Sequence, residues 1–149
     1  MNKERVFRQL CIDEGVKYEI YRDHLGYLTF GVGHLVTKND PEYGLLEGAS
    51  ISEERVWEAF EQDLKTASSE CTRLYGNKFM MWPDEVQEVL VNMMFNLGRP
   101  RLSKFVKFRQ ALENKDWAEA AAEGRNSLWY YQVGARAERL MERLEKVGE

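Results

Sequence analysis

Two carboxylic acids nine positions apart, Glu14 and Asp23, are the residues of this sequence best suited to do chemistry. Glu14 closes a helical pattern on the same face as Leu10, where the negative end of the helix dipole and an apolar neighbour both disfavour a charged carboxylate. A carboxyl group that stays protonated can act as a general acid. Asp23 stands beside a turn, so we expect it to be solvated and ionised. Glycoside hydrolysis needs such a pair of unlike carboxyl groups.

Taken alone, these two acids are weak evidence for glycoside hydrolysis, because a capping or surface role is the commoner use of such residues. Thr29 lies two residues beyond Tyr27 on the same face of a predicted strand, and its hydroxyl could hold a water molecule between the acids. A threonine in a strand usually reflects strand propensity only. His34 could act as a base or a ligand, although a structural hydrogen bond is the more ordinary role of a histidine.

Neither a metal nor a nucleotide fits the remaining polar residues. Cys11, Cys71, His24 and His34 do not have the spacing of a metal site. The segment Gly31-Val32-Gly33 lacks the third glycine and the following helix of a dinucleotide loop. We therefore predict no metal and no cofactor.

The 149 residues are 44% hydrophobic and 31% charged, which is typical of one globular domain or two small lobes. The two cysteines lie in apolar helical patterns and are expected to be free thiols. No segment resembles a secretory signal or reaches the length of a membrane span. We therefore expect a soluble protein that carries no visible export signal.

The net charge of −4 is unevenly distributed along the chain. Residues 1–98 contain 10 basic and 17 acidic groups, whereas residues 99–149 contain 11 basic and 8 acidic groups. The basic C-terminal part could meet an anionic partner, but a solvated helical surface is the more ordinary explanation.

The pattern of hydrophobic residues predicts which elements hold the candidate acids. A helix is expected to end at Glu14, where Gly15 can cap it. Alternating residues from Lys17 to Gly33 predict a hairpin or small sheet. A long helix is expected over 53–75, because its apolar residues recur at steps of three and four after a serine cap. At about 34 Å it would join two lobes.

The second half of the chain reads as helices packed around a buried centre. Pro83 opens an almost wholly apolar helix that ends at Gly98. Further helices are expected over 101–113, 115–124 and 134–146. Arg136, Arg139 and Arg143 share one face of the last helix, where one arginine turned inward could pair with a buried acid.

Several of these residues also form a motif. The sequence contains Glu14-Gly15, Tyr21-x-Asp23 and Gly26-x-x-Thr29-x-Gly31-x-Gly33-His34. In residue type and spacing this motif resembles the catalytic signature of the phage-type lysozymes, the T-even phage lysozymes of glycoside hydrolase family 24. Segments beginning at Asn92, Trp117 and Ser127 look like core helices of that family in the same order. The resemblance covers nearly the whole chain.

The resemblance implies a mainly helical α+β fold with two lobes in a single lysozyme domain. A small N-terminal antiparallel sheet would lie in a lobe of about residues 13–55, and the connecting helix would run over about 53–75. The C-terminal lobe would comprise about 76–149 together with the helix over 1–14.

The resemblance also implies muramidase activity on the β-1,4 bond between N-acetylmuramic acid and N-acetylglucosamine in bacterial peptidoglycan, with inversion. By residue-by-residue carry-over, Glu14 is the general acid, Asp23 assists the attacking water and Thr29 helps to place it. Four further residues match supporting or substrate-binding positions: His34, Arg136, Leu35 and Phe95. The chain departs from the family at Phe108 and Glu123, where relatives present a serine and an asparagine to the saccharide.

As a member of this family the protein would be an endolysin, held in the host cytoplasm until a separate holin-like membrane protein opens a path to the wall. We expect peptidoglycan as its partner, no nucleic acid, no stable membrane association and a monomeric state. Two alternatives remain open: a wall-binding module that does not cut, and a transglycosylase that leaves anhydro ends instead of reducing ends.

Overall fold

The computed structural model describes all 149 residues and divides them into two compact units. The sheet unit comprises Lys3–Thr66, and the helical unit comprises Met1–Asn2 together with Ala67–Glu149. Seven α-helices, one 3-10 helix and a three-stranded antiparallel sheet make a mainly helical α+β protein. The predicted fold class is therefore confirmed.

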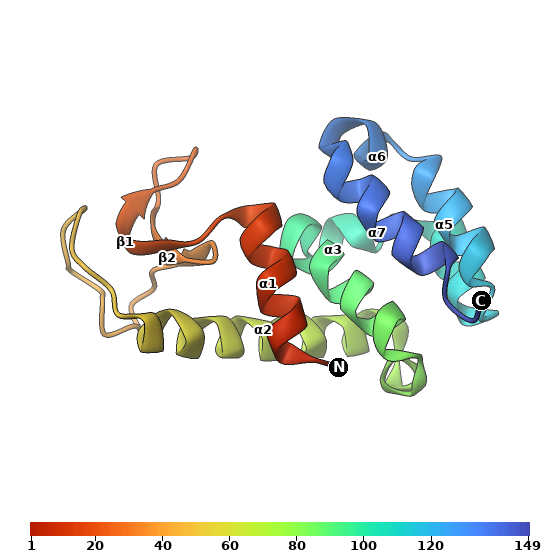
Figure 1. The fold of residues 1–149 in the computed structure, drawn as a ribbon, viewed down its shortest axis with the longest axis horizontal. Coiled ribbons are helices and arrows are strands. Elements are labelled where there is room, and N and C mark those ends of the chain that lie inside the picture. The colour runs from red at the N-terminus through yellow and green to blue at the C-terminus, as the bar shows by residue number, and fades with distance from the viewer. The chain divides into compact units, whose positions relative to one another are not determined.

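The sheet unit places a small sheet beside two helices (Figure 1). Its elements are α1 (Lys3–Glu14), β1 (Lys17–Arg22), β2 (Leu28–Gly31), β3 (His34–Leu35) and the first part of α2 (Glu53–Tyr75). Strand β2 lies between β1 and β3, and both pairings are antiparallel. The turn between β1 and β2 contains Gly26 at φ 89°, a conformation that glycine adopts without strain. The predicted hairpin is confirmed.

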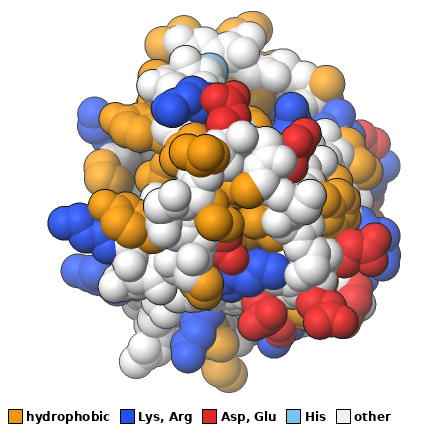
Figure 2. Space-filling view, turned by 90° about the vertical axis from the view of Figure 1, so that its left-hand side faces the viewer, with side chains coloured by type: hydrophobic (Ala, Val, Ile, Leu, Met, Phe, Trp, Pro, Cys, Tyr) orange, Lys and Arg blue, Asp and Glu red, His pale blue; other side chains and the backbone are white.

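Large apolar side chains of the sheet unit also reach its surface. The view toward the side where β1 lies shows hydrophobic side chains at several places among charged ones (Figure 2). The most exposed large apolar side chains of the sheet unit include Ile12, Leu25, Tyr43 and Leu46. No helix in the protein combines the length and the apolar character that crossing a membrane would need.

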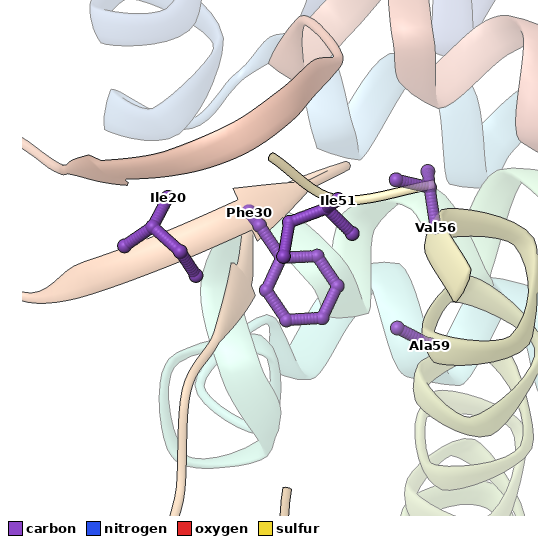
Figure 3. Close-up of a cluster of buried hydrophobic side chains, with 5 residues drawn as sticks. All are labelled: Ile20, Phe30, Ile51, Val56 and Ala59. Carbon is purple, nitrogen blue, oxygen red and sulfur yellow. The ribbon is translucent and has the colours of Figure 1, made fainter. Parts of the chain in front are cut away.

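The core of the sheet unit is small and joins the strands to α2. Its buried members are Ile20, Phe30, Ile51, Val56 and Ala59. Phe30 of β2 occupies the middle of this cluster, and Ala59 of α2 points toward it (Figure 3). Because side chains alternate along a strand, the burial of Phe30 puts its neighbour Thr29 on the opposite face of the sheet.

The long helix predicted over 53–75 is present as α2 with those bounds. The Ser52 hydroxyl accepts a hydrogen bond from the Arg55 amide at 3.1 Å, which is the predicted N-terminal cap. Helix α2 begins in the sheet unit and ends in the helical unit. Helix α1 belongs to the sheet unit, whereas the sequence-based division grouped it with the C-terminal lobe.

The helical unit is built around α3. Its elements after α2 are η1 (Asn77–Met81), α3 (Asp84–Leu102), α4 (Val106–Glu113), α5 (Trp117–Arg125), α6 (Leu128–Val133) and α7 (Ala135–Glu145). The residues from Val86 to Met94 are all buried, as the apolar pattern predicted. At Gly98 the backbone leaves helical geometry, with φ 77° and ψ 161°. The predicted break at Gly98 is therefore confirmed, although a short helical stretch resumes beyond it.

One helix start in this unit was predicted wrongly, and one short helix was not predicted. The helix expected over 101–113 begins only at Val106, because Phe105 before it has the non-helical angles φ −81° and ψ 74°. The six-residue helix α6 was not predicted. It is too short to show a hydrophobic repeat, but Ser127 caps it by accepting a hydrogen bond from the Tyr130 amide.

Candidate active site

Glu14 is the last residue of α1, and its carboxylate lies near the turn between β2 and β3. Gly15 follows it at φ 79° and ends the helix, with its amide bonded to the Cys11 carbonyl at 2.9 Å. A Cβ atom added at Gly33 would lie 3.9 Å from Glu14 Oε2. The expectation that Glu14 is shielded with Leu10 is wrong, because Leu10 is fully buried and Glu14 is exposed. The helix end therefore holds the carboxylate at an accessible edge of the sheet.

Asp23 is fixed by the turn that it opens. Its Oδ1 atom accepts hydrogen bonds from the amides of Leu25 and Tyr27, both at 2.9 Å. Its own amide donates to the Tyr27 carbonyl, and its carbonyl accepts from the Gly26 amide. Asp23 Oδ2 accepts no hydrogen bond from the protein. One carboxylate oxygen thus sets the orientation while the other can bind a water molecule or a ligand.

Tyr21 connects the surroundings of the two acids. Burial raises the pKa of its phenol, and the negative charges of Asp23 and Glu14 raise it further. Both carboxylates therefore act on one phenol group at the end of β1. The Lys17 ammonium lies 4.8 Å from the centre of the Tyr21 ring on the opposite part of the strand. Sequence reasoning did not give Tyr21 a role, although its position two residues before Asp23 places both on the same face of the chain.

Thr29 faces this group from the neighbouring strand. It pairs with Tyr21 across β1 and β2 and with Leu35 across β2 and β3. Its side chain is buried, and its hydroxyl donates to the Tyr27 carbonyl at 2.9 Å. Because that bond uses the only hydroxyl proton, the Thr29 oxygen can only accept a further hydrogen bond. A water molecule that donates to Thr29 would have its oxygen lone pairs free for other contacts.

His34 is held by two carboxylates, one on each ring nitrogen. Its Nδ1 atom lies 2.8 Å from Asp63 Oδ2, and its Nε2 atom lies 3.0 Å from Asp40 Oδ2. Burial favours the neutral ring, but the hydrogen bonds and charges of Asp63 and Asp40 outweigh it and raise the pKa of His34. Both nitrogens can donate only in the imidazolium form. The predicted structural hydrogen bond is therefore present, twice over.

Asp40, which contacts His34 Nε2, also contacts Arg55, and Arg55 forms an ion pair with Glu42. Arg55 donates to Glu42 through two nitrogens at 2.8 and 2.9 Å and to Asp40 Oδ1 at 3.2 Å. Burial alone would raise the pKa of Asp40, but bonds from the Thr37 amide and from His34 hold it below its usual value. We call the linked residues the charge network: Asp63, His34, Asp40, Arg55 and Glu42. It ties β3 to α2 through the loop between them.

Leu35, a predicted substrate contact, is half exposed next to Thr29 on the sheet edge. The two other predicted residues belong to the helical unit. Phe95 lies on α3 and is half-buried. Arg136 lies buried on α7, where its Nε donates to Asn92 Oδ1 at 3.0 Å. The structure thus places Glu14, Asp23, Thr29, His34 and Leu35 in the sheet unit. Thr29 and Leu35 share one face of the sheet, whereas His34 lies with Phe30 on the other face.

The predicted inward arginine of the last helix is found at Arg143 as well. Its guanidinium lies 2.9 Å from Glu85 Oε2 and 3.0 Å from Glu88 Oε1. Glu88 is 1% exposed, so this pair involves a buried acid. The arginine face of α7 is therefore partly a packing surface of the helical unit.

Comparisons with known proteins identify the family of the chain. The family model for phage lysozyme matches residues 12–146. The chain belongs to the phage lysozyme family. Its sequence is 34% identical to "Probable T4-type lysozyme 2" of Dictyostelium discoideum, over 89% of this chain and 88% of that protein. The family resemblance inferred from the motif is therefore confirmed.

Two phage proteins are also similar to this member of the phage lysozyme family. It is 30% identical to "Pre-baseplate central spike protein Gp5" of Enterobacteria phage T4, over 86% of this chain but 25% of that protein. It is 27% identical to "Peptidoglycan hydrolase gp36" of Pseudomonas phage phiKMV, over 97% of this chain and 16% of that protein. Together with the family model, these relatives support a lysozyme-like cell-wall hydrolase.

The two departures from the family pattern line the same surface pocket in this phage lysozyme family member but differ in exposure and chemistry. Phe108 is 2% exposed on α4 and belongs to the core of the helical unit. Glu123 lines a surface pocket of about 270 Å³ together with Lys107 and Asn126. Phe108 can offer a saccharide no polar group, whereas Glu123 presents a carboxylate to the surface.

Proposed function

We propose that the protein is a muramidase that hydrolyses the β-1,4 bond between N-acetylmuramic acid and N-acetylglucosamine in bacterial peptidoglycan. The observation that carries the proposal is the grouping of Glu14, Asp23 and Thr29 around Tyr21 in one unit of a phage lysozyme family member. The printed name of the phiKMV relative supports peptidoglycan as the substrate class.

The geometry suggests a division of labour between the two acids. Glu14, at the accessible end of α1, would donate its proton to the glycosidic oxygen as the bond to the anomeric carbon breaks. Asp23, held by its turn with Oδ2 available, would accept a proton from a water molecule that attacks that carbon. Such an in-line attack inverts the configuration and needs carboxyl groups roughly 6.5 to 9.5 Å apart.

Thr29 would place the attacking water. Its hydroxyl proton is engaged with the Tyr27 carbonyl, so its oxygen accepts a hydrogen bond from the water and leaves one water proton for Asp23. His34 and the rest of the charge network would support the sheet from behind without taking part in proton transfer. Leu35 would contact the saccharide. Phe95 and Arg136 keep the substrate-binding and supporting roles that the family resemblance gives them.

We further propose that the enzyme serves host lysis in a phage cycle, acting from the host cytoplasm once a holin-like protein opens the membrane. The similarity to proteins of two phages supports this setting. Expression of the chain alone in bacteria tests it. Lysis should require membrane permeabilisation by a second agent, and spontaneous lysis would contradict the proposed location.

The catalytic proposal is tested with suspensions of purified peptidoglycan. Glu14→Gln should slow the loss of turbidity at least about 100-fold, because an amide cannot donate the proton that a general acid supplies. Glu19→Gln, which removes an exposed acid of β1 in the same unit, is the matched control and should keep the wild-type rate. Equal rates for wild type and Glu14→Gln would exclude Glu14 as the acid.

Product analysis separates the three candidate activities. Hydrolysis yields reducing ends, and an inverting enzyme releases the α-anomer first. A transglycosylase would yield anhydro ends, and a wall-binding module would retain the protein on peptidoglycan without releasing fragments. Reducing ends with initial β-configuration would refute the proposed inversion while leaving hydrolysis intact.

A further inference from the structure

Two adjoining pockets on the helical unit form one continuous surface. The first has a volume of about 200 Å³, and the second has a volume of about 270 Å³. They share Lys104, Phe105 and Ser127. We call the surrounding surface the basic-apolar face. The exposed residues that line its pockets include Arg101, Lys104, Val106, Lys107 and Leu128. Tyr131 lines neither pocket but is exposed on α6, three positions after Leu128. The face lies at the junction of α3, α4 and α6.

The three cations of this face are not neutralised by the protein. Arg101, Lys104 and Lys107 make no ion pair, whereas the flanking Arg99 and Arg109 pair with Glu70 and Glu113. Glu123 is the only acid that lines either pocket of the face. Glu123 also lines a third pocket, together with Asp116 and Glu119, so acidic residues border the face on that side. The face therefore carries a local positive charge on a protein whose net charge is −4.

Large apolar side chains stand exposed among these cations. Val106 is 58% exposed, Leu128 is 71% exposed and Tyr131 is 76% exposed. Leu128 and Tyr131 lie three positions apart on α6, so their side chains emerge on one side of that helix. Cations alone would fit any soluble polyanion, but such a ligand gives no reason to expose leucine, valine and tyrosine beside them.

We propose that the basic-apolar face docks reversibly on a bilayer with anionic phospholipid headgroups. Lys and Arg would lie at the phosphate level, while Val106, Leu128 and Tyr131 would enter the interface between headgroups and acyl chains. This contact differs from the absence of stable membrane association expected from the sequence, because it is peripheral and weakens with salt. It is independent of the acids in the sheet unit.

The test measures partition of the full chain onto sedimenting vesicles. Vesicles of phosphatidylglycerol and phosphatidylethanolamine should bind the protein at low salt, and phosphatidylcholine vesicles should not. The double variant Lys104→Gln with Lys107→Gln should reduce partition roughly 25-fold, because each cation near an anionic surface contributes about fivefold. Lys38→Gln with Lys65→Gln removes two other unpaired cations and should leave partition within about twofold.

The contribution of apolar side chains to vesicle binding is tested with a separate variant and its matched control. Leu128→Ser should reduce partition roughly tenfold, whereas Met81→Ser, at a residue 83% exposed elsewhere on the helical unit, should have little effect. All six substitutions in these four variants are on exposed side chains, and circular dichroism tests whether each variant is folded. Polyphosphate serves as a soluble polyanion for comparison.

Three results would overturn the proposal. The first is equal binding to anionic and neutral vesicles, or to neither. The second is an equal loss of binding in the two double variants. The third is loss of binding to polyphosphate or to isolated peptidoglycan in the Lys104 and Lys107 variant with vesicle binding unchanged, which would make the face a site for a soluble or wall-bound anion.

Discussion

The sheet unit and the helical unit are stabilised in different ways. The sheet unit encloses a small apolar cluster and adds the charge network, in which Asp40, His34 and Glu42 are almost wholly buried. The helical unit is built on α3, from which eleven side chains are buried. The helical unit also holds a buried acid, Glu88, paired with Arg143, but beside a much larger set of buried apolar side chains. Packing should therefore dominate the stability of the helical unit, and buried charges should make a larger share of the stability of the sheet unit.

The largest effect is expected from a cavity in the helical unit. Phe79 is fully buried and contacts the rings of Tyr75 and Trp82. Phe79→Ala should lower the free energy of unfolding by about 3 to 5 kcal/mol, measured by denaturant titration. Phe79→Leu, which keeps most of the volume, is the control and should cost less. A loss below about 1 kcal/mol for the alanine variant would show that packing does not dominate this unit.

The charge network of the sheet unit should give the next largest effect. Glu42→Gln removes the charge that Arg55 contacts through two nitrogens. The Arg55 side chain is 19% exposed and keeps its contact with Asp40, so solvent and Asp40 both reduce the cost of the lost carboxylate. We expect a loss of about 2 to 3 kcal/mol in the free energy of unfolding, below the full range for a buried pair. Glu47→Gln, at a solvent-exposed ion pair with Arg22, is the matched control and should change little.

Stability should also depend on pH through His34. Its pKa is raised in the folded protein, so the imidazolium stabilises the fold fully below the unfolded value of about 6.5. That contribution to stability is lost as the pH rises through the pKa of His34 in the folded protein. The free energy of unfolding, measured from pH 6 upward, should therefore fall in the wild type. The slope should be smaller in His34→Gln, and an identical slope in both proteins would exclude His34 as its source.

Asp40 has the opposite dependence within the same network. Its pKa is lowered in the folded protein, so its contribution is present above the unfolded value of about 4 and is lost as the pH falls. The network is thus strongest between the two limits, in the weakly acidic range. Because His34 and Asp40 respond to pH in opposite directions, the stability contributed by the charge network depends on pH. The stability contributed by an apolar core does not.

Local signals predicted the elements well where they were strong. The repeat of α2 and the serine before it fixed both ends of that helix, and Gly98 marked the break in α3. The helix expected over 101–113 was wrong at its start because the angles at Phe105 depend on packing, which residue spacing does not encode.

The candidate site was predicted only in part. Its motif proposed Glu14 and Asp23, but it did not predict the exposure of Glu14 or the effect of both negative charges on the Tyr21 phenol. The partners of His34 were not predicted either, because Asp40 and Asp63 lie 6 and 29 residues further along the chain. Such contacts depend on how the strands and α2 are brought together, and no local periodicity records them.

The smallest effect is expected from an ion pair on the surface of the helical unit. Arg109 donates to Glu113 at 2.8 Å, the same distance as the Arg55 contact with Glu42, and the two residues are four apart on α4. Because solvent screens both charges, Glu113→Gln should lower the free energy of unfolding by only about 0.3 to 0.5 kcal/mol. Glu113 also lies 3.2 Å from Lys78, so Lys78→Gln is measured alongside to separate the two contacts. If Glu113→Gln lowered the free energy of unfolding as much as Glu42→Gln, burial would not explain a difference in strength between the two ion pairs. The contrast between the two units would then have to rest on packing alone.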